Sequence, residues 1–226
     1  MIKKAFTLAE VLITLGVIGI VAAMTLPSIT QSAKKKEYTA RLKKFDSMMQ
    51  QAILASTVDH ENPEYWDKPL MAYNEEGKFD TVTNANITEV FFKKYLAPYI
   101  KYTSFDKFEL PKGDEELKGY QFRVMLADGS IFYTHNGTCI DFSYDVNGER
   151  NPNKEGYDRF RFLLCNARNI AYNYCGSEII HWCSYAPRVV ATREMALERC
   201  KTSPAYCSTL LKYDDWEFKD DYPFHL

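Results

Sequence analysis

The sequence predicts an α+β fold in which a long N-terminal helix packs on an antiparallel sheet and disulfides hold the C-terminal region. Three features predict it. An apolar run over residues 6–26 continues into an amphipathic helical pattern over residues 28–56. Residues 120–134 alternate as two strands around an Asp-Gly turn. All six cysteines lie between positions 139 and 207, far from the apolar run.

The apolar run reads FTLAEVLITLGVIGIVAAMTL, and Glu10 is its only charged residue. As a helix its twenty-one residues measure roughly 31 Å, close to the ~30 Å hydrocarbon core of a bilayer. Secretory signal peptides have shorter apolar regions, about 7 to 15 residues, followed by a small-x-small cleavage site. No such site precedes the end of this run at Pro27. The sequence therefore predicts a membrane helix that stays on the mature chain.

Glu10 needs a partner in that environment. A carboxylate inside a membrane helix costs about 2.5 to 3.5 kcal/mol, and such residues normally pair with a cation. The run contains no Lys, Arg or His. A cut before Phe6 would create an amine four residues from Glu10, on the same face of the helix. That amine would pair with its own Glu10 or with that of a neighbouring subunit. A plain, uncleaved anchor is the alternative, and it leaves Glu10 unexplained.

These residues resemble the leader and first helix of type IV prepilins and type II secretion pseudopilins. The resemblance covers about the first thirty residues: a short basic leader (MIKKA), a Phe, a Glu at the fifth mature position, the apolar run and a closing proline. It implies cleavage between Ala5 and Phe6 with methylation of the new amine, assembly through Glu10, and a helix kink at Pro27. The family usually has Gly before the cut, where this chain has Ala5.

The resemblance also implies what the chain does. In that family a prepilin peptidase processes the subunit, and an inner-membrane assembly platform extracts it into a helical filament. The expected protein is therefore a structural subunit of a type IV pilus or a type II secretion pseudopilus, with other subunits and inner-membrane lipid as further partners. It would cross the bacterial inner membrane once, with its head in the periplasm, before joining the filament. The alternative is a minor or tip subunit whose head binds DNA, a surface or a secretion substrate.

The expected segments are a leader over residues 1–5, a membrane and filament-core helix over 6–27, an amphipathic helix over 28–56 and a head over 57–226. One observation opposes this orientation. Two lysines precede the apolar run, whereas six Lys and Arg follow it between positions 34 and 44. Counted alone, these charges would place the head in the cytoplasm. The prepilin-like leader and the cysteines, which suit an oxidising compartment, outweigh that count.

The cysteines are even in number and include no Cys-x-x-Cys, so they indicate disulfides rather than zinc ligands. Fifteen pairings are formally possible, and the sequence does not choose among them. The last two cysteines are close and bracket a Thr-Ser-Pro turn, which favours their pairing; proximity makes the other two pairs plausible. Six reduced, buried thiols are the alternative. The favoured pair is Cys200–Cys207, and the two pairs suggested by proximity alone are Cys139–Cys165 and Cys175–Cys183.

The head begins with the amphipathic helix, whose expected buried positions recur every three or four residues. They are Tyr38, Leu42, Phe45, Met49, Ala52 or Ile53, and Ser56. Residues 60–80 are polar and contain Pro63, Pro69 and Gly77, which predicts loop. A helix is expected over residues 89–99, capped by Asn86 or Thr88 and ended near Pro98.

The sheet is expected after a further loop over residues 106–119. Strands are predicted on both sides of the turn in 120–134, then over 138–144 and 159–164. Short helices are predicted over 166–174 and 192–200. The last eleven residues, WEFKDDYPFHL, are expected to form an extended tail packed by its aromatic side chains.

The stretch from 141 to 158, DFSYDVNGERNPNKEGYD, concentrates oxygen ligands and resembles half of an EF-hand-type calcium loop. Ser143 stands where that loop has its first Asp, and Lys154 stands where it has the closing Glu. The alternative is an Asn-Gly turn followed by a polar loop without metal. The candidate calcium ligands are Asp145, Asn147, Glu149, Asn153 and Asp158.

Other chemistry is not indicated. The formal net charge of −2 argues against nucleic-acid binding, except by a tip subunit of the kind named above. The four histidines are scattered, and the sequence has no Gly-rich phosphate loop, Gly-x-Ser-x-Gly or His-Glu-x-x-His. The expectation is a protein that is not an enzyme and requires no cofactor.

Overall fold

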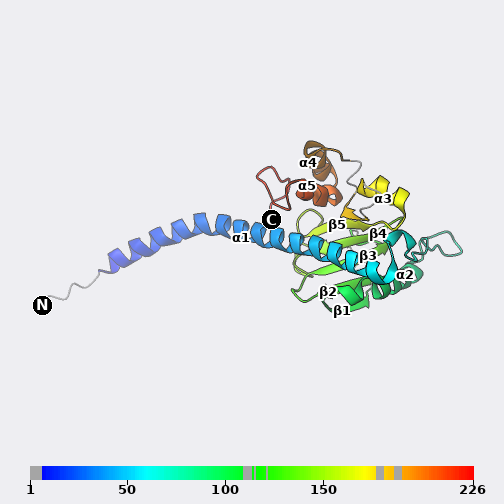
Figure 1. Cartoon of the computed structure of the whole chain (residues 1–226). Helices are drawn as coiled ribbons and strands as arrows, with labels where there is room; N and C mark the ends of the chain where they lie inside the picture. The colour runs from blue at the N-terminus through cyan, green and yellow to red at the C-terminus, as the bar shows by residue number, and fades with distance from the viewer. Residues whose placement is uncertain (1–6, 109–113, 115, 121, 177–180, 186–189) are drawn as a thin grey trace.

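The computed structural model describes residues 7–108, 114, 116–120, 122–176, 181–185 and 190–226. One long helix, α1 (Leu8–His60), dominates the molecule. Its N-terminal half projects free, and its C-terminal half lies across the head (Figure 1). The predicted leader over residues 1–5 and the cleavage residues Ala5 and Phe6 lie outside the described residues.

Helix α1 continues through Pro27 without a break, as the sequence predicted. A proline removes one helical N–H donor and usually bends the helix. Figure 1 shows a gentle curve in the projecting half. Hydroxyl groups on both sides of the proline donate to helix carbonyls, Thr25 to Val21 and Thr30 to Leu26. The helix is therefore one rod that links the apolar run to the head.

The C-terminal half of α1 buries a stripe on the sheet, and the predicted spacing is confirmed. Phe45 lies at its centre, stacked on Tyr144 with ring centroids 3.9 Å apart. The edges of Phe162 and Trp182 complete the contact. The buried residues of the stripe are Tyr38, Leu42, Phe45, Asp46, Met49, Ala52, Ile53 and Ser56.

The sheet is a six-stranded antiparallel meander in the order β1-β2-β3-β4-β5-β6. Its strands are β1 (Tyr102–Lys107), β2 (Phe122–Leu126), β3 (Ile131–Asn136), β4 (Ile140–Asp145), β5 (Arg159–Leu164) and β6 (Trp182–Ser184). The Asp-Gly turn pairs Val124 with Phe132, as the hairpin pattern predicted. Side chains that alternate along β2 to β5 bury one aromatic face against α1. The predicted α+β architecture is therefore present.

Two expectations in the first half of the head were wrong. Helix α2 (Thr81–Tyr95) begins at the N-cap Asp80, not near Asn86 or Thr88. The Asp80 carboxylate accepts the first free backbone N–H groups, which outweighs the low helix propensity of the Thr-Val-Thr start. Strand β1 occupies part of the predicted loop over 106–119; its side chains are mostly exposed, so it has no apolar alternation.

The C-terminal region matches its prediction more closely. Helices α3 (Arg168–Cys175) and α4 (Arg193–Thr202) lie within two residues of the predicted ends. Helix α5 (Cys207–Tyr213) and β6 were not predicted. The tail packs through three buried aromatic residues, Trp216, Phe218 and Tyr222. The structure contains the favoured disulfide Cys200–Cys207 and both pairs suggested by proximity, Cys139–Cys165 and Cys175–Cys183.

Truncating Phe45 should strongly destabilise the head. Phe45→Ala leaves a cavity against Tyr144, so we expect a loss of about 3–5 kcal/mol in unfolding free energy. Urea denaturation of the detergent-solubilised chain, followed by tryptophan fluorescence, measures this. Leu54→Ala is the matched control on the same helix; its side chain is 70% exposed, and its expected effect is within ~0.5 kcal/mol. Equal effects of the two changes would contradict the packing described.

Candidate functional site

The projecting half of α1 is apolar on every side and covered by nothing in the structure. An 18-residue window has a mean hydropathy of 2.2, and none of it is buried. A helix that is apolar all round needs either a protein core or a membrane. The exposed large side chains are Leu8, Val11, Leu12, Ile13, Leu15, Val17, Ile18, Ile20, Val21, Met24, Leu26 and Ile29. This segment is long and apolar enough to cross a membrane.

Glu10 lies in the first turn of α1 and forms a capping box with Thr7. Its carboxylate accepts hydrogen bonds from the Thr7 backbone N–H and hydroxyl, both at 2.8 Å. The Thr7 hydroxyl accepts from the Glu10 N–H at 3.3 Å. The sequence carries this signal as Thr-x-x-Glu, and our sequence analysis missed it. The carboxylate thus turns back onto the backbone N–H of Thr7, and no cation pairs with it among the described residues.

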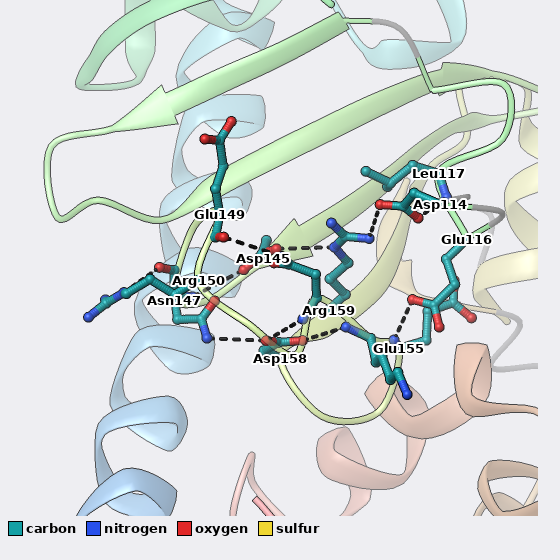
Figure 2. Close-up of polar contacts among 12 residues, drawn as sticks. Asp114, Glu116, Leu117, Asp145, Asn147, Glu149, Arg150, Glu155, Asp158 and Arg159 are labelled. Atoms are coloured by element: carbon teal, nitrogen blue, oxygen red, sulfur yellow. Dashed lines mark hydrogen bonds and ion pairs between the residues drawn. The ribbon is translucent and has the colours of Figure 1, made fainter. Parts of the chain in front are cut away.

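The connection between β4 and β5 forms a second candidate site around two carboxylates that are fully buried, Asp145 and Asp158. Asp158 closes the turn that precedes β5 (Figure 2). It accepts the backbone N–H groups of Asn153 at 2.9 Å and Lys154 at 2.7 Å. It also accepts the side-chain amide of Asn147 at 3.1 Å. Both carboxylate oxygens of Asp158 are therefore held by N–H donors.

Arg159 supplies the positive charge of this site, and the sequence analysis did not identify it. Its side chain is 4% exposed, and its guanidinium lies between Asp145, at 3.1 Å, and Asp114, at 2.8 Å (Figure 2). Glu116 accepts the backbone N–H of Glu155 at 2.7 Å. These contacts fasten Asp114 and Glu116 to the β4–β5 connection.

Burial raises the pKa of the Asp145 carboxyl to about 7, and the nearby Asp158 carboxylate acts in the same direction. The Arg159 guanidinium opposes this rise but does not cancel it. Asp145 therefore exchanges its proton near neutral pH rather than in the acidic range.

The same connection also contacts α1 and the tail. Asn147 donates to the Tyr38 hydroxyl at 3.0 Å, and Arg41 donates to the Val146 carbonyl at 2.8 Å. The Tyr222 hydroxyl donates to the Gly156 carbonyl at 2.6 Å. The connection therefore joins α1, the sheet and the tail.

The predicted calcium ligands do not converge as calcium requires. Asp145, Asn147 and Asp158 lie together, but the Glu149 carboxylate points away from them (Figure 2). It pairs instead with Arg123. Calcium takes six to eight oxygens, whereas the two buried carboxylates already bond to N–H donors and Arg159.

The side-chain amide oxygens of Asn147 and Asn153 accept no hydrogen bond from any described residue, but two such oxygens fall short of the six to eight that calcium takes. In the described part of the chain, no three His, Cys, Asp or Glu residues are grouped as metal ligands. As arranged, these residues do not fit calcium.

The fold and sites together define a disulfide-bonded α+β head carried on a long helix whose apolar half is free. Residues 28–226 match the family of unknown function DUF6613, and the chain therefore belongs to that family. The match begins directly after Pro27, so the apolar half of α1 lies outside it. No curated protein and no solved structure matches the chain.

The buried carboxylates predict a head that is more stable in mild acid than at neutral pH. Folding raises the pKa of Asp145 from 3.8 to about 7, so its contribution is complete below pH 3.8 and lost as the pH rises to about 7. We expect unfolding free energy to fall by on the order of 2 kcal/mol between about pH 5 and pH 7.5.

Urea denaturation across that range measures the fall. Asp145→Asn should make the profile shallower without flattening it, because burial also raises the pKa of Asp141 to about 7 and that carboxyl still titrates. A head that is equally stable, or more stable, at the higher pH would contradict this assignment.

The same loop predicts indifference to calcium. Because N–H donors and Arg159 already occupy the carboxylates, adding excess Ca²⁺ or a chelator should shift the melting temperature by less than ~1 °C. Differential scanning calorimetry at neutral pH is the measurement, with Mg²⁺ as the control for ionic strength. A Ca²⁺-specific rise of several degrees would show that the loop rearranges to bind the ion.

Proposed function

We propose that the chain is a structural subunit of a type IV pilus or a type II secretion pseudopilus, processed before Phe6. The observation that carries the proposal is the single helix α1. Its N-terminal half is apolar and free, and its C-terminal half is fixed to the head. Such a rod holds the subunit in a membrane and later joins neighbouring rods in a filament. The prepilin-like N-terminal residues support the same proposal.

Two environments suit the free half of α1. Lipid covers its apolar side chains, and all backbone groups in the helix interior bond within the helix. A bundle of identical helices covers them equally well, since lipid tails are about as apolar as leucine. A Cβ atom added at Gly16 or Gly19 would meet no other part of the chain within 4 Å, so both positions lie open, and such small residues let helices approach closely. Exchange between lipid and filament therefore changes the apolar free energy little, so a polar contact can set the register.

Glu10 supplies that polar contact. Cleavage before Phe6 creates an amine one residue from Thr7, toward which the Glu10 carboxylate already turns. Pairing with the amine of an adjacent subunit removes the cost of an unpaired acid in hydrocarbon, about 2.5 to 3.5 kcal/mol. The subunit therefore enters the filament at the one axial position where acid and amine meet.

The head remains outside the cytoplasm in this proposal. Its three disulfides suit an oxidising compartment such as the periplasm. They close the C-terminal region of the head, which forms the outer surface of the filament while the helices form its core.

Removing the acid tests the proposal. Glu10→Ala should give a processed, membrane-resident protein that is absent from sheared filaments, because no carboxylate remains to pair with the Phe6 amine. Thr7→Ala is the matched control: it removes the capping hydroxyl, worth about 1 kcal/mol, but keeps the acid, and should still assemble. Immunoblots of sheared and membrane fractions measure both.

Ala5→Glu completes the test, because a bulky charge before the cut should block cleavage and leave the leader on the chain. Mass spectrometry of the intact protein detects this. Normal incorporation of Glu10→Ala, or a wild-type mature chain that still begins at Met1, would reject the proposed function.

A further inference from the structure

Charge is separated along the axis of the head. We call residues 28–44 the proximal segment and residues 54–79 the distal segment. The proximal segment carries six Lys and Arg against one Glu, and the distal segment six Asp and Glu against two Lys. Figure 1 shows that the end of α1 and the loop after it lie at the opposite end of the head from the projecting half. The head is therefore basic where α1 enters it and acidic at its far end.

Contacts within the chain leave part of each charge unpaired. In the proximal segment Arg41, Lys43 and Lys44 form ion pairs with residues of the same chain. The remaining cations have no carboxylate partner among the described residues. They are Lys34, Lys35 and Lys36.

In the distal segment Glu64 pairs with Arg168 and Glu76 pairs with Lys78, while Asp59 accepts from the Tyr99 hydroxyl. Three exposed acids have no ion-pair partner in the part of the chain that the structure describes. They are Glu61, Asp67 and Glu75. Among the described residues, three cations at one end of the head and three acids at the other thus form no ion pair, although Asp67 lies within electrostatic reach of Lys94.

The distal segment also exposes apolar surface. Its exposed large apolar side chains are Leu54, Val58, Tyr65, Leu70 and Tyr73. A groove of about 610 Å³ runs beside the end of α1, lined in part by Leu54, Pro63 and Trp182. At the other end a groove of about 640 Å³ lies between α1 and the tail, lined in part by Lys35, Lys36 and Phe218. Glu217 and Asp220 of the tail also line the proximal groove, and Arg168 lines the distal groove beside Glu64. Each end thus combines an apolar recess with a segment in which charge of one sign predominates.

We propose that the distal segment of one copy binds the proximal segment of a second copy, with Glu61, Asp67 and Glu75 against Lys34, Lys35 and Lys36. The two patches differ, so the contact is head-to-tail and repeats into an open chain. Along α1, the lysines of the proximal segment lie about twenty residues before the helical part of the distal segment. Contacting copies are therefore offset by roughly 30 Å along the helix axis. This contact rests on the proposed filament function and adds a second determinant of register to Glu10.

Lipid phosphates are the competing partner for the lysines, which follow Pro27 by only two helical turns. Lipid would account for the basic end but leaves the acidic, apolar distal end without a partner. A second copy accounts for both ends at once, and oppositely charged surfaces also steer association.

A charge exchange tests the contact in the full chain. Lys35→Glu with Lys36→Glu, and separately Glu61→Lys with Glu75→Lys, should each lower the amount in sheared filaments at least about tenfold, because like charges then meet. The four changes combined should restore it to within about threefold of wild type. Arg199→Glu with Lys201→Glu is the matched control: both residues are exposed on α4, away from the two segments, and incorporation should not change.

Each result decides between the alternatives. Loss in the proximal variant without rescue in the combined variant overturns the contact and assigns the lysines to lipid phosphates. An inert distal variant overturns it as well. A photo-crosslinking residue at position 58, which is 84% exposed, should attach to residues 28–44 of another copy, and attachment elsewhere also overturns it. If the wild-type chain is found in filaments and the charge exchange does not change its amount there, only this contact is rejected. If the wild-type chain is absent from filaments, the proposed function itself is rejected.

Discussion

The packing of the α1 stripe on the aromatic face of the sheet is the interaction on which the rest of the structure depends. Phe45 stacks on Tyr144, and the buried Asp46 accepts from the Trp182 indole at 2.9 Å and from Lys212 at 2.7 Å. Burial of apolar area stabilises this interface, while the polar contacts of Asp46 fix the position of α1 along the sheet. Because only the C-terminal half of α1 is held in this way, the other half is free for a membrane or for other helices.

The β4–β5 connection fastens this interface from the side. Asp158 organises its turn through backbone N–H groups, and Arg159 balances part of the buried negative charge between Asp145 and Asp114. The Arg159 guanidinium supplies the positive charge beside these carboxylates, so the loop does not need a metal ion from solution. In a calcium loop the bound ion supplies that charge. Burial, together with the nearby Asp158 carboxylate, raises the pKa of Asp145 to about 7, because the Arg159 guanidinium offsets only part of these effects.

The proposed function uses the two ends of α1 differently. In the membrane or filament core the surroundings of Glu10 are apolar, so leaving its carboxylate unpaired costs much free energy. Pairing with a single amine is therefore enough to fix the register of the subunit. Around the head the contacts are in water, where each charge pair contributes little and several must act together. A filament built on both would be held by its core and aligned by its surface, which is consistent with the separation of acids from lysines along α1.

The sequence by itself determined the long helix, its buried stripe, the hairpin and the expectation of disulfides, because periodicity, turn residues and cysteine spacing are local properties. Only the tertiary structure decided the start of α2 at Asp80, the exposed edge strand β1, and the joining of Asp114, Asp145 and Arg159 across 45 residues of chain. It also turned Glu149 away from the other predicted calcium ligands. Which oxygen meets a metal and which meets an arginine depends on surfaces that folding brings together, and the spacing of residues along the chain does not encode that choice.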